Sequence, residues 1–195
     1  MNTKELSQEE KWMMSYLDEL QLRGFIKYYT HQPDPFILSD QIEYKFRKEF
    51  KTKDDQIINK TLINGHIYTP DFFIQWNELL NTKLVTHTHK IFNDGIATKL
   101  PPFLCNMDGK SYVEVKGIFD RNNMTRLFTT RTQPWVFEKF RIYINLIKMP
   151  DLLKNTFIPE SILSEFFYKR DTKKNKVGDK KYQWKYKSLK EFITS

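Results

Sequence analysis

Residues 112–117 have the sequence YVEVKG, in which two valines alternate with a tyrosine, a glutamate and a lysine. Side chains of a β-strand point alternately to its two faces, so Tyr112, Glu114 and Lys116 share one face and the valines share the other. The valines are the natural core side. The pattern therefore predicts a strand over residues 110–119 that carries a carboxylate beside an ammonium group. The alternative for this pair is an ion pair on a solvated face.

A second carboxylate interrupts an apolar stretch upstream, YTPDFFIQW at residues 68–76. Asp71 follows Pro70, which marks a strand start or an edge kink. Buried aspartate is rare unless it is paired or binds a metal, although a turn or cap role is the alternative here. Two carboxylates from neighbouring strands suit Mg²⁺, which binds through one or two carboxylates and keeps several waters. Such an ion activates water and neutralises phosphate charge, and a nearby lysine can stabilise a transferring phosphoryl group.

Outward from these strands, the first predicted element is a helix over residues 7–23. Ser7 and Glu10 form a capping box, apolar residues recur on one face, and Gly24 is a natural stop. The other predicted elements include a two-strand hairpin joined at Asn64-Gly65. In chain order they are an extended segment over 25–38, a helix or an edge strand over 40–50, strands over 56–64 and 66–76, a strand over 83–88, a helix in two pieces over 122–140 with Thr132 as cap and Pro134 near the second start, a strand over 141–148, and helices over 160–168 and 187–194.

The string Pro70-Asp71, followed by Glu114-Val115-Lys116, resembles the signature of the PD-(D/E)XK nuclease superfamily. This superfamily includes restriction enzymes, Holliday-junction resolvases, phage exonucleases and transposon-end-cleaving nucleases. Tyr29 to Leu38 and Tyr68 to Phe72 are similar to stretches of the transposon-end enzymes, and the resemblance covers about residues 7–148.

The resemblance implies an α/β fold with a restriction-endonuclease-like core of helix, three strands, helix and strand, in which helices flank a mixed sheet. We expect this core over residues 1–150. The 42 residues between Asp71 and Glu114 exceed the family's usual hairpin, which predicts an insertion at about 77–109. Residues 151–195 are then a basic C-terminal extension that packs on or next to the core.

The function implied by the resemblance is a Mg²⁺- or Mn²⁺-dependent endonuclease that hydrolyses DNA. Asp71, Glu114 and the Val115 carbonyl would hold the metal, and Lys116 would orient the attacking water. Many family members carry an acidic residue on the first helix, and Glu10 is the candidate for it here. Glu10 could instead serve only as a helix cap, with Glu9 as its rival. A catalytically inactive DNA-binding module and a structural or assembly protein are the alternative functions.

The formal net charge is +8 and the isoelectric point about 9.3, which makes a polyanion a plausible partner. Residues 165–195 hold 10 basic and 4 acidic side chains, so most of the surplus is C-terminal. Basic residues with interleaved aromatics can bind nucleic acid, although a solvated face and a lysine-protected edge strand are the alternatives. The candidate contacts are Arg121, Arg126, Arg131, Lys180, Lys181, Trp184 and Lys185.

The single cysteine, Cys105, excludes an intrachain disulfide and fits a small core residue in an intracellular protein. No secretory signal and no apolar run of membrane-spanning length is visible. We therefore expect DNA as the partner, no membrane, a cytoplasmic location and a homodimer or a partner subunit. The composition suits a phage or mobile-element protein. His87 and His89 are expected to be a surface pair rather than zinc ligands, and His31 and His66 receive no role.

Overall fold

The central element of the fold is a four-stranded mixed sheet with the order β1-β6-β9-β10. Its strands are β1 (Ile26–His31), β6 (Phe72–Trp76), β9 (Lys110–Lys116) and β10 (Ile144–Lys148). The first three run antiparallel to their neighbours, and β10 runs parallel to β9. The computed structural model describes residues 6–77, 90–93, 96–99, 103–106, 108–117, 124–167 and 185–194, with backbone only for 90–93, 96–99 and 166–167.

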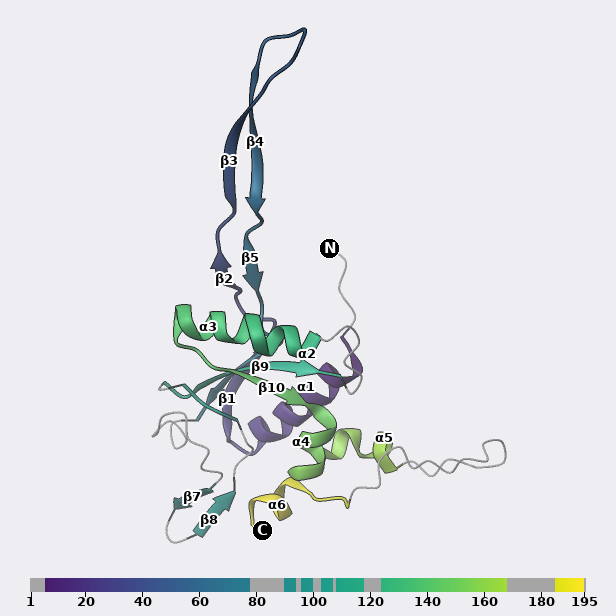
Figure 1. The fold of residues 1–195 in the computed structure, drawn as a ribbon. Helices are drawn as coiled ribbons and strands as arrows, with labels where there is room; N and C mark the ends of the chain where they lie inside the picture. The colour runs from purple at the N-terminus through teal and green to yellow at the C-terminus, as the bar shows by residue number, and fades with distance from the viewer. Residues whose placement is uncertain are drawn as a thin grey trace, which may run out of the picture.

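Helices cover both faces of this sheet (Figure 1). Helix α1 (Gln8–Leu22) packs on the face that carries Val113, and a helical run packs on the face that carries Tyr112. The run consists of α2 (Met124–Leu127), a π-helical segment (Phe128–Thr132) and α3 (Gln133–Phe140). The expected mixed sheet flanked by helices is confirmed at this level.

The first helix forms as its sequence predicts. Ser7 and Glu10 make both hydrogen bonds of the capping box, and Gly24 follows with a positive φ of 76°. The helix buries one continuous stripe against the sheet, made of Trp12, Met13, Tyr16, Leu17 and Leu20.

The C-terminal part of the chain contributes to the same core layer. Its described elements are α4 (Met149–Asn155), a 3₁₀ turn (Glu160–Ile162), α5 (Leu163–Phe167) and α6 (Leu189–Ile193). The Phe157 ring stacks on Tyr16, with 4.3 Å between ring centroids, and Phe192 of α6 lies on the other side of Phe157 at 6.1 Å. No helix in the described ranges has both the length and the apolar character needed to cross a bilayer.

A long two-stranded arm, residues 36–68, extends away from the body (Figure 1). At its base, β2 (Phe36–Ser39) pairs with β5 (His66–Tyr68), and further out β3 (Ile42–Lys48) pairs with β4 (Gln56–Ile63). Both pairs are antiparallel. A separate short pair, β7 (Lys90–Asn93) with β8 (Ile96–Lys99), lies within the expected insertion.

The predicted hairpin at Asn64-Gly65 is wrong. Strand β4 pairs with β3, not with the strand after Gly65, so the dipeptide lies where the outer pair gives way to the base pair. A Cβ at Gly65 would lie 3.4 Å from the Ser39 oxygen, so glycine allows the two chains to approach closely there. The sequence predicted a turn at this dipeptide because apolar strands flank it. The true partner of β4 is β3, which lies in the segment 40–50 that the sequence left open between helix and strand.

The second α-helical piece begins at Gln133 with Pro134 in its first turn, as predicted, but the predicted cap at Thr132 is wrong. Thr132 has helical backbone angles, with φ −64° and ψ −52°, and its side chain caps nothing. The Gln133 amide instead bonds the Phe128 carbonyl five residues back. This wider turn carries the backbone past Pro134, which has no N–H to donate.

Candidate functional site

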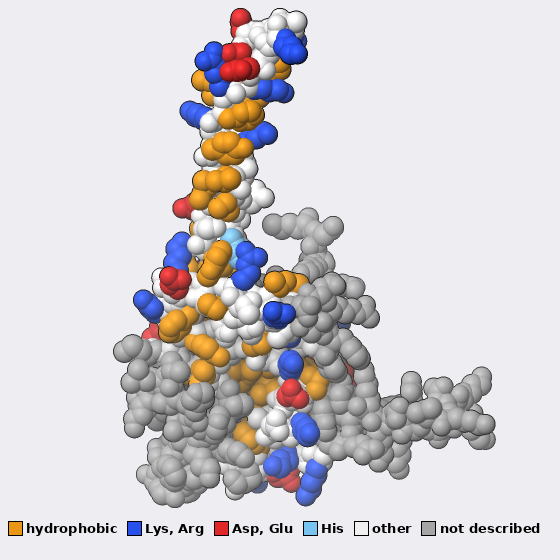
Figure 2. All heavy atoms as spheres, in the orientation of Figure 1, with side chains coloured by type: hydrophobic (Ala, Val, Ile, Leu, Met, Phe, Trp, Pro, Cys, Tyr) orange, Lys and Arg blue, Asp and Glu red, His pale blue; other side chains and the backbone are white. Residues whose placement is uncertain are grey.

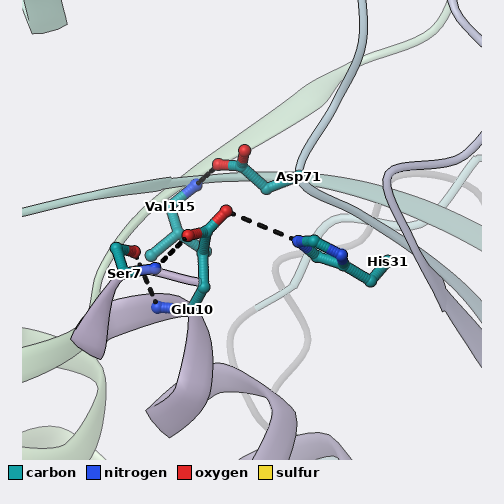
Figure 3. Close-up of polar contacts among 5 residues, drawn as sticks. All are labelled: Ser7, Glu10, His31, Asp71 and Val115. Carbon is teal, nitrogen blue, oxygen red and sulfur yellow. Dashed lines mark hydrogen bonds and ion pairs between the residues drawn. The ribbon is translucent and has the colours of Figure 1, made fainter. Parts of the chain in front are cut away.

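Strand β9 continues beyond the start of β6, and Asp71 lies at that step. Phe72 is paired with Val113, so the last residues of β9 have no strand beside them on the β6 side. The Asp71 Oδ2 atom accepts a hydrogen bond from the Val115 N–H at 2.7 Å (Figure 3). The N–H and C=O of one strand residue point to the same edge, so the Val115 carbonyl lies on the edge that faces Asp71.

Glu114 lies on the face of β9 that does not carry Val115, and its carboxylate is held between Tyr68 and Lys116. Its Oε2 accepts a hydrogen bond from the Tyr68 hydroxyl at 2.8 Å, and its Oε1 is 2.5 Å from the Lys116 Nζ. Only 8% of Glu114 is exposed, and the Lys116 Nζ lies 5.7 Å from the centroid of the Phe128 ring. The face that carries this ion pair is therefore covered by the helical run, and it is not the solvated face of the alternative interpretation.

Glu10 caps the first helix and also contacts a side chain at the end of the sheet. Its Oε2 accepts a hydrogen bond from the Ser7 N–H at 2.7 Å, which completes the helix cap. Its Oε1 lies 3.4 Å from the His31 Nε2, and the carboxyl group is directed toward Asp71 (Figure 3). Glu9 also faces this end of the sheet, because a Cβ at Gly117 would lie 3.3 Å from the Glu9 Oε1.

Negative charges gather around the Asp71 carboxyl group. Burial and the nearby Glu114 charge raise the pKa of Asp71 to about 7, although the Val115 hydrogen bond opposes them. Glu10 raises this pKa further, and Lys116 lowers it. For Glu10 itself, burial favours a higher pKa, but the Ser7 hydrogen bonds and His31 outweigh it, so the pKa is lowered. A cation at Asp71 would relieve this concentration of negative charge.

The donor set decides which metal would suit the site. Within the described ranges, no three His, Cys, Asp or Glu side chains form a metal-binding group. The described side chains therefore do not suit structural zinc, which takes four protein ligands. Mg²⁺ needs only one or two carboxylates and completes its shell with water. Asp71, Glu114 and the Val115 carbonyl fit that requirement, provided that Lys116 releases the Glu114 Oε1.

Three of the predicted nucleic-acid contacts lie in the described part of the chain, and all three are exposed. Arg126 and Arg131 are exposed on the helical run, where the Arg131 guanidinium lies 5.8 Å from the Trp135 ring centroid. Lys185 is exposed ahead of α6. The other predicted contacts lie outside the described residues: Arg121, Lys180, Lys181 and Trp184. The predicted strand over 83–88 and the histidine pair, His87 and His89, also lie outside them.

Two side chains that received no role from the sequence belong to the site. Tyr68 holds Glu114, and His31 holds Glu10 from the end of β1. Tyr68 is three residues before Asp71, so the YTPD string could have suggested it. His31 is 21 residues from Glu10, and no local pattern connects them.

Comparisons of this chain with protein-family models, with curated proteins and with solved structures give no match. A function therefore has to be argued from the side chains that meet at the end of the sheet. Those side chains are the buried carboxylate of Glu114, the half-buried carboxylate of Asp71, a lysine paired with Glu114, and a third carboxylate at the start of α1.

Proposed function

We propose that this chain is a Mg²⁺- or Mn²⁺-dependent nuclease that hydrolyses phosphodiester bonds in DNA. The observation that carries the proposal is the meeting of Asp71, Glu114 and Lys116 at one end of the central sheet. The first two are held by a backbone amide and a tyrosine hydroxyl, respectively. A charged trio of this kind, with Glu114 buried and the other two half-buried, contributes nothing to packing that apolar residues would not do better.

The order of elements supports the same assignment. Helix α1, strands β1, β6 and β9, helix α3 and strand β10 follow one another along the chain, with the arm inserted between β1 and β6. This is the helix, three strands, helix and strand order expected for a restriction-endonuclease-like core. Asp71 begins β6 and Glu114 lies on β9, which are adjacent in the sheet.

In the proposed reaction, Asp71, Glu114 and the Val115 carbonyl would hold the metal. When bound, the ion would lower the pKa of a water molecule and neutralise charge on the scissile phosphate. Lys116 is released from Glu114 and directs its ammonium group toward the attacking water or a phosphate oxygen. Water attacks phosphorus, the bond to the leaving oxygen breaks, and that oxygen takes up a proton.

The chain's other residues would act by holding these groups in place. The Val115 N–H fixes one oxygen of Asp71, which directs the second oxygen outward from β9. The Tyr68 hydroxyl fixes Glu114 in the same way. Burial raises the pKa of Tyr68, so this hydroxyl keeps its proton and stays a donor. Glu10 and His31 add a third carboxylate whose charge acts on Asp71.

A cleavage assay tests the proposal. Supercoiled plasmid and branched DNA are incubated with the protein and Mg²⁺, Mn²⁺ or EDTA, beside Lys116→Ala and Lys110→Ala. Lys110 is the matched control, because it lies at the other end of β9 in an exposed ion pair with Asp108. We expect metal-dependent cutting that Lys116→Ala abolishes and Lys110→Ala preserves.

The same assay distinguishes the second candidate function, an inactive nuclease-fold DNA-binding module. The observation that favours this alternative is the 2.5 Å Lys116–Glu114 contact, which occupies both groups that the reaction needs. Binding of DNA without cutting under any metal condition would support it and reject the nuclease. Equal cutting by Lys116→Ala and the parent chain would show that the activity arises elsewhere.

A further inference from the structure

The outer part of the arm is amphipathic. Strand residues alternate between faces, so the pairing of β3 with β4 sorts their side chains into two sets. One face is mainly apolar. It carries Ile42 opposite Ile63, Tyr44 opposite Lys60, Phe46 opposite Ile58 and, at its outer end, Lys48 opposite Gln56. The Tyr44 and Phe46 ring centroids are 6.2 Å apart. The other face is mostly polar, and its members are Glu43, Lys45, Arg47, Ile57, Asn59 and Thr61.

No described part of the body lies under the apolar face of the arm. Figure 2 shows a row of hydrophobic side chains along the arm, well beyond the body. Ile42, Tyr44 and Ile63 are 48%, 43% and 49% exposed, respectively. The apolar face of an antiparallel sheet ordinarily packs on a core, and a two-stranded ribbon alone is marginally stable in water. The arm therefore needs a covering partner.

The charges of the arm are separated along its length. The outer half, residues 44–60, has six Lys or Arg and three Asp or Glu residues. The inner half, residues 36–43 and 61–68, has two acids, Asp40 and Glu43, and no Lys or Arg. The tip of the arm is therefore basic and its base is acidic.

We propose that the partner is a second copy of this chain, with the two arms packed antiparallel through their apolar faces. This arrangement places the basic tip of each arm beside the acidic base of the other. It is also isologous, since the same surface is used by both copies around a two-fold axis. A nucleic acid suits the surface less well, because protein–DNA interfaces are strongly positive and the whole arm has six basic against five acidic residues.

The first test measures the oligomeric state of the full chain without DNA, by sedimentation velocity over a range of concentrations. We expect a dimer that the variant Ile42→Lys, Tyr44→Lys weakens by at least about 30-fold in dissociation constant, since two apolar interface residues are replaced by charged ones. Asn59→Lys, Thr61→Lys adds the same charge to the polar face and is the matched control. Circular dichroism confirms that each variant is folded.

The second test measures the orientation of the arms by disulfide cross-linking in a Cys105→Ser background. Ile42→Cys and Lys48→Cys place thiols at the two ends of the apolar face. Antiparallel arms cross-link when the two variants are mixed, whereas parallel arms cross-link within each variant alone. A monomer at every concentration, or a dimer that the apolar-face variant leaves intact, would overturn the proposal. Duplex binding lost with that variant in a monomeric chain would assign the face to DNA instead.

Neither test uses the nuclease activity. Dimerisation is measured without DNA or metal, so its failure would leave the proposed reaction untouched. Conversely, an inactive chain that still dimerises through the arm would reject only the nuclease.

Discussion

Asp71 is the residue at which the acid–base chemistry of the site can be measured most directly. Burial and the Glu114 charge raise its pKa to about 7, so near neutral pH it shares its time between the protonated and ionised forms. A metal ligand has to be ionised, and binding of a cation therefore displaces this proton. Metal affinity and proton release are thus expected to be coupled at this one carboxyl group.

The first prediction concerns that coupling. Below pH 7, we expect Mg²⁺ or Mn²⁺ affinity to increase about 10-fold for each unit by which the pH is raised, because one proton competes with the metal. Above pH 7 the affinity should level off. Isothermal titration calorimetry in buffers of different ionisation enthalpy measures both the affinity and the proton released. Asp71→Asn keeps an acceptor for the Val115 N–H but should lose the binding. A pH-independent affinity would contradict the assignment of Asp71 as a ligand.

The second prediction concerns stability without metal. The pKa of Asp71 is raised above its ordinary value of 3.8, so its contribution to stability is fully present below about pH 4 and is lost as pH rises through about 7. Asp71→Asn should therefore stabilise the metal-free protein at pH 8 by at most a few kcal/mol, and hardly at all at pH 4. Urea unfolding at the two pH values measures this difference, and equal effects at both would contradict it.

The third prediction concerns Tyr68. Tyr68→Phe removes the hydroxyl that donates to Glu114 and should cost about 1–3 kcal/mol of unfolding free energy, because a buried carboxylate loses a donor. Tyr44→Phe is the control, since Tyr44 is exposed on the arm and should change stability little. Chemical denaturation measures both. Tyr68→Phe should also raise the metal concentration that half-maximal cutting requires in the nuclease assay. A purely structural loss would not change this concentration.

At the residue scale, the sequence predicted the site as far as strand alternation and the family's motif extend. The alternation of YVEVKG places Val113 and Val115 in the main core and Glu114 on the other side, as the structure has them. The alternation could not indicate that Glu114 is also buried, because its cover comes from the helical run. His31 was out of reach for the same reason, since only the folded chain places it beside Glu10.

At the element scale, helices and strands with strong local signals formed where they were expected, and strand partners did not always follow. The capping box predicted the start of α1 correctly, because it depends on four consecutive residues. The partner of β4 depends on which distant segment is extended, and the segment 40–50 gave no preference. A rule for turns then selected the wrong hairpin at Asn64-Gly65.

The fourth prediction compares two caps of identical design. Ser7 with Glu10 at the start of α1, and Ser188 with Glu191 at the start of α6, each form a complete capping box. Ser7→Ala and Ser188→Ala should each cost about 1 kcal/mol of unfolding free energy. Only Ser7→Ala should also change metal affinity, because it releases a carboxylate whose charge acts on Asp71. Thermal unfolding with and without Mg²⁺ separates the two effects, and equal metal responses would contradict a site role for Glu10.

At the scale of the whole molecule, the base of the arm and the site are joined. Tyr68 ends the arm and donates to Glu114, and Lys139 of α3 donates to the Ile37 carbonyl on the opposite strand of the base. The outer strands β3 and β4 are different, because neither contributes a residue to the two core clusters. The arm thus consists of a base that belongs to the body and an outer ribbon that does not.

The fifth prediction follows from that division. A chain in which residues 42–63 are replaced by a short glycine-containing turn keeps β2, β5 and Tyr68. At concentrations where the parent is monomeric, it should unfold within about 1 kcal/mol of the parent, since no core side chain is lost. Calorimetric or urea unfolding measures this, and metal binding at Asp71 should be unchanged. A truncation that also removes Tyr68 is the control and should impair both. If the shorter deletion itself unfolds the body, the outer ribbon is part of the cooperative fold and the division of the arm is rejected.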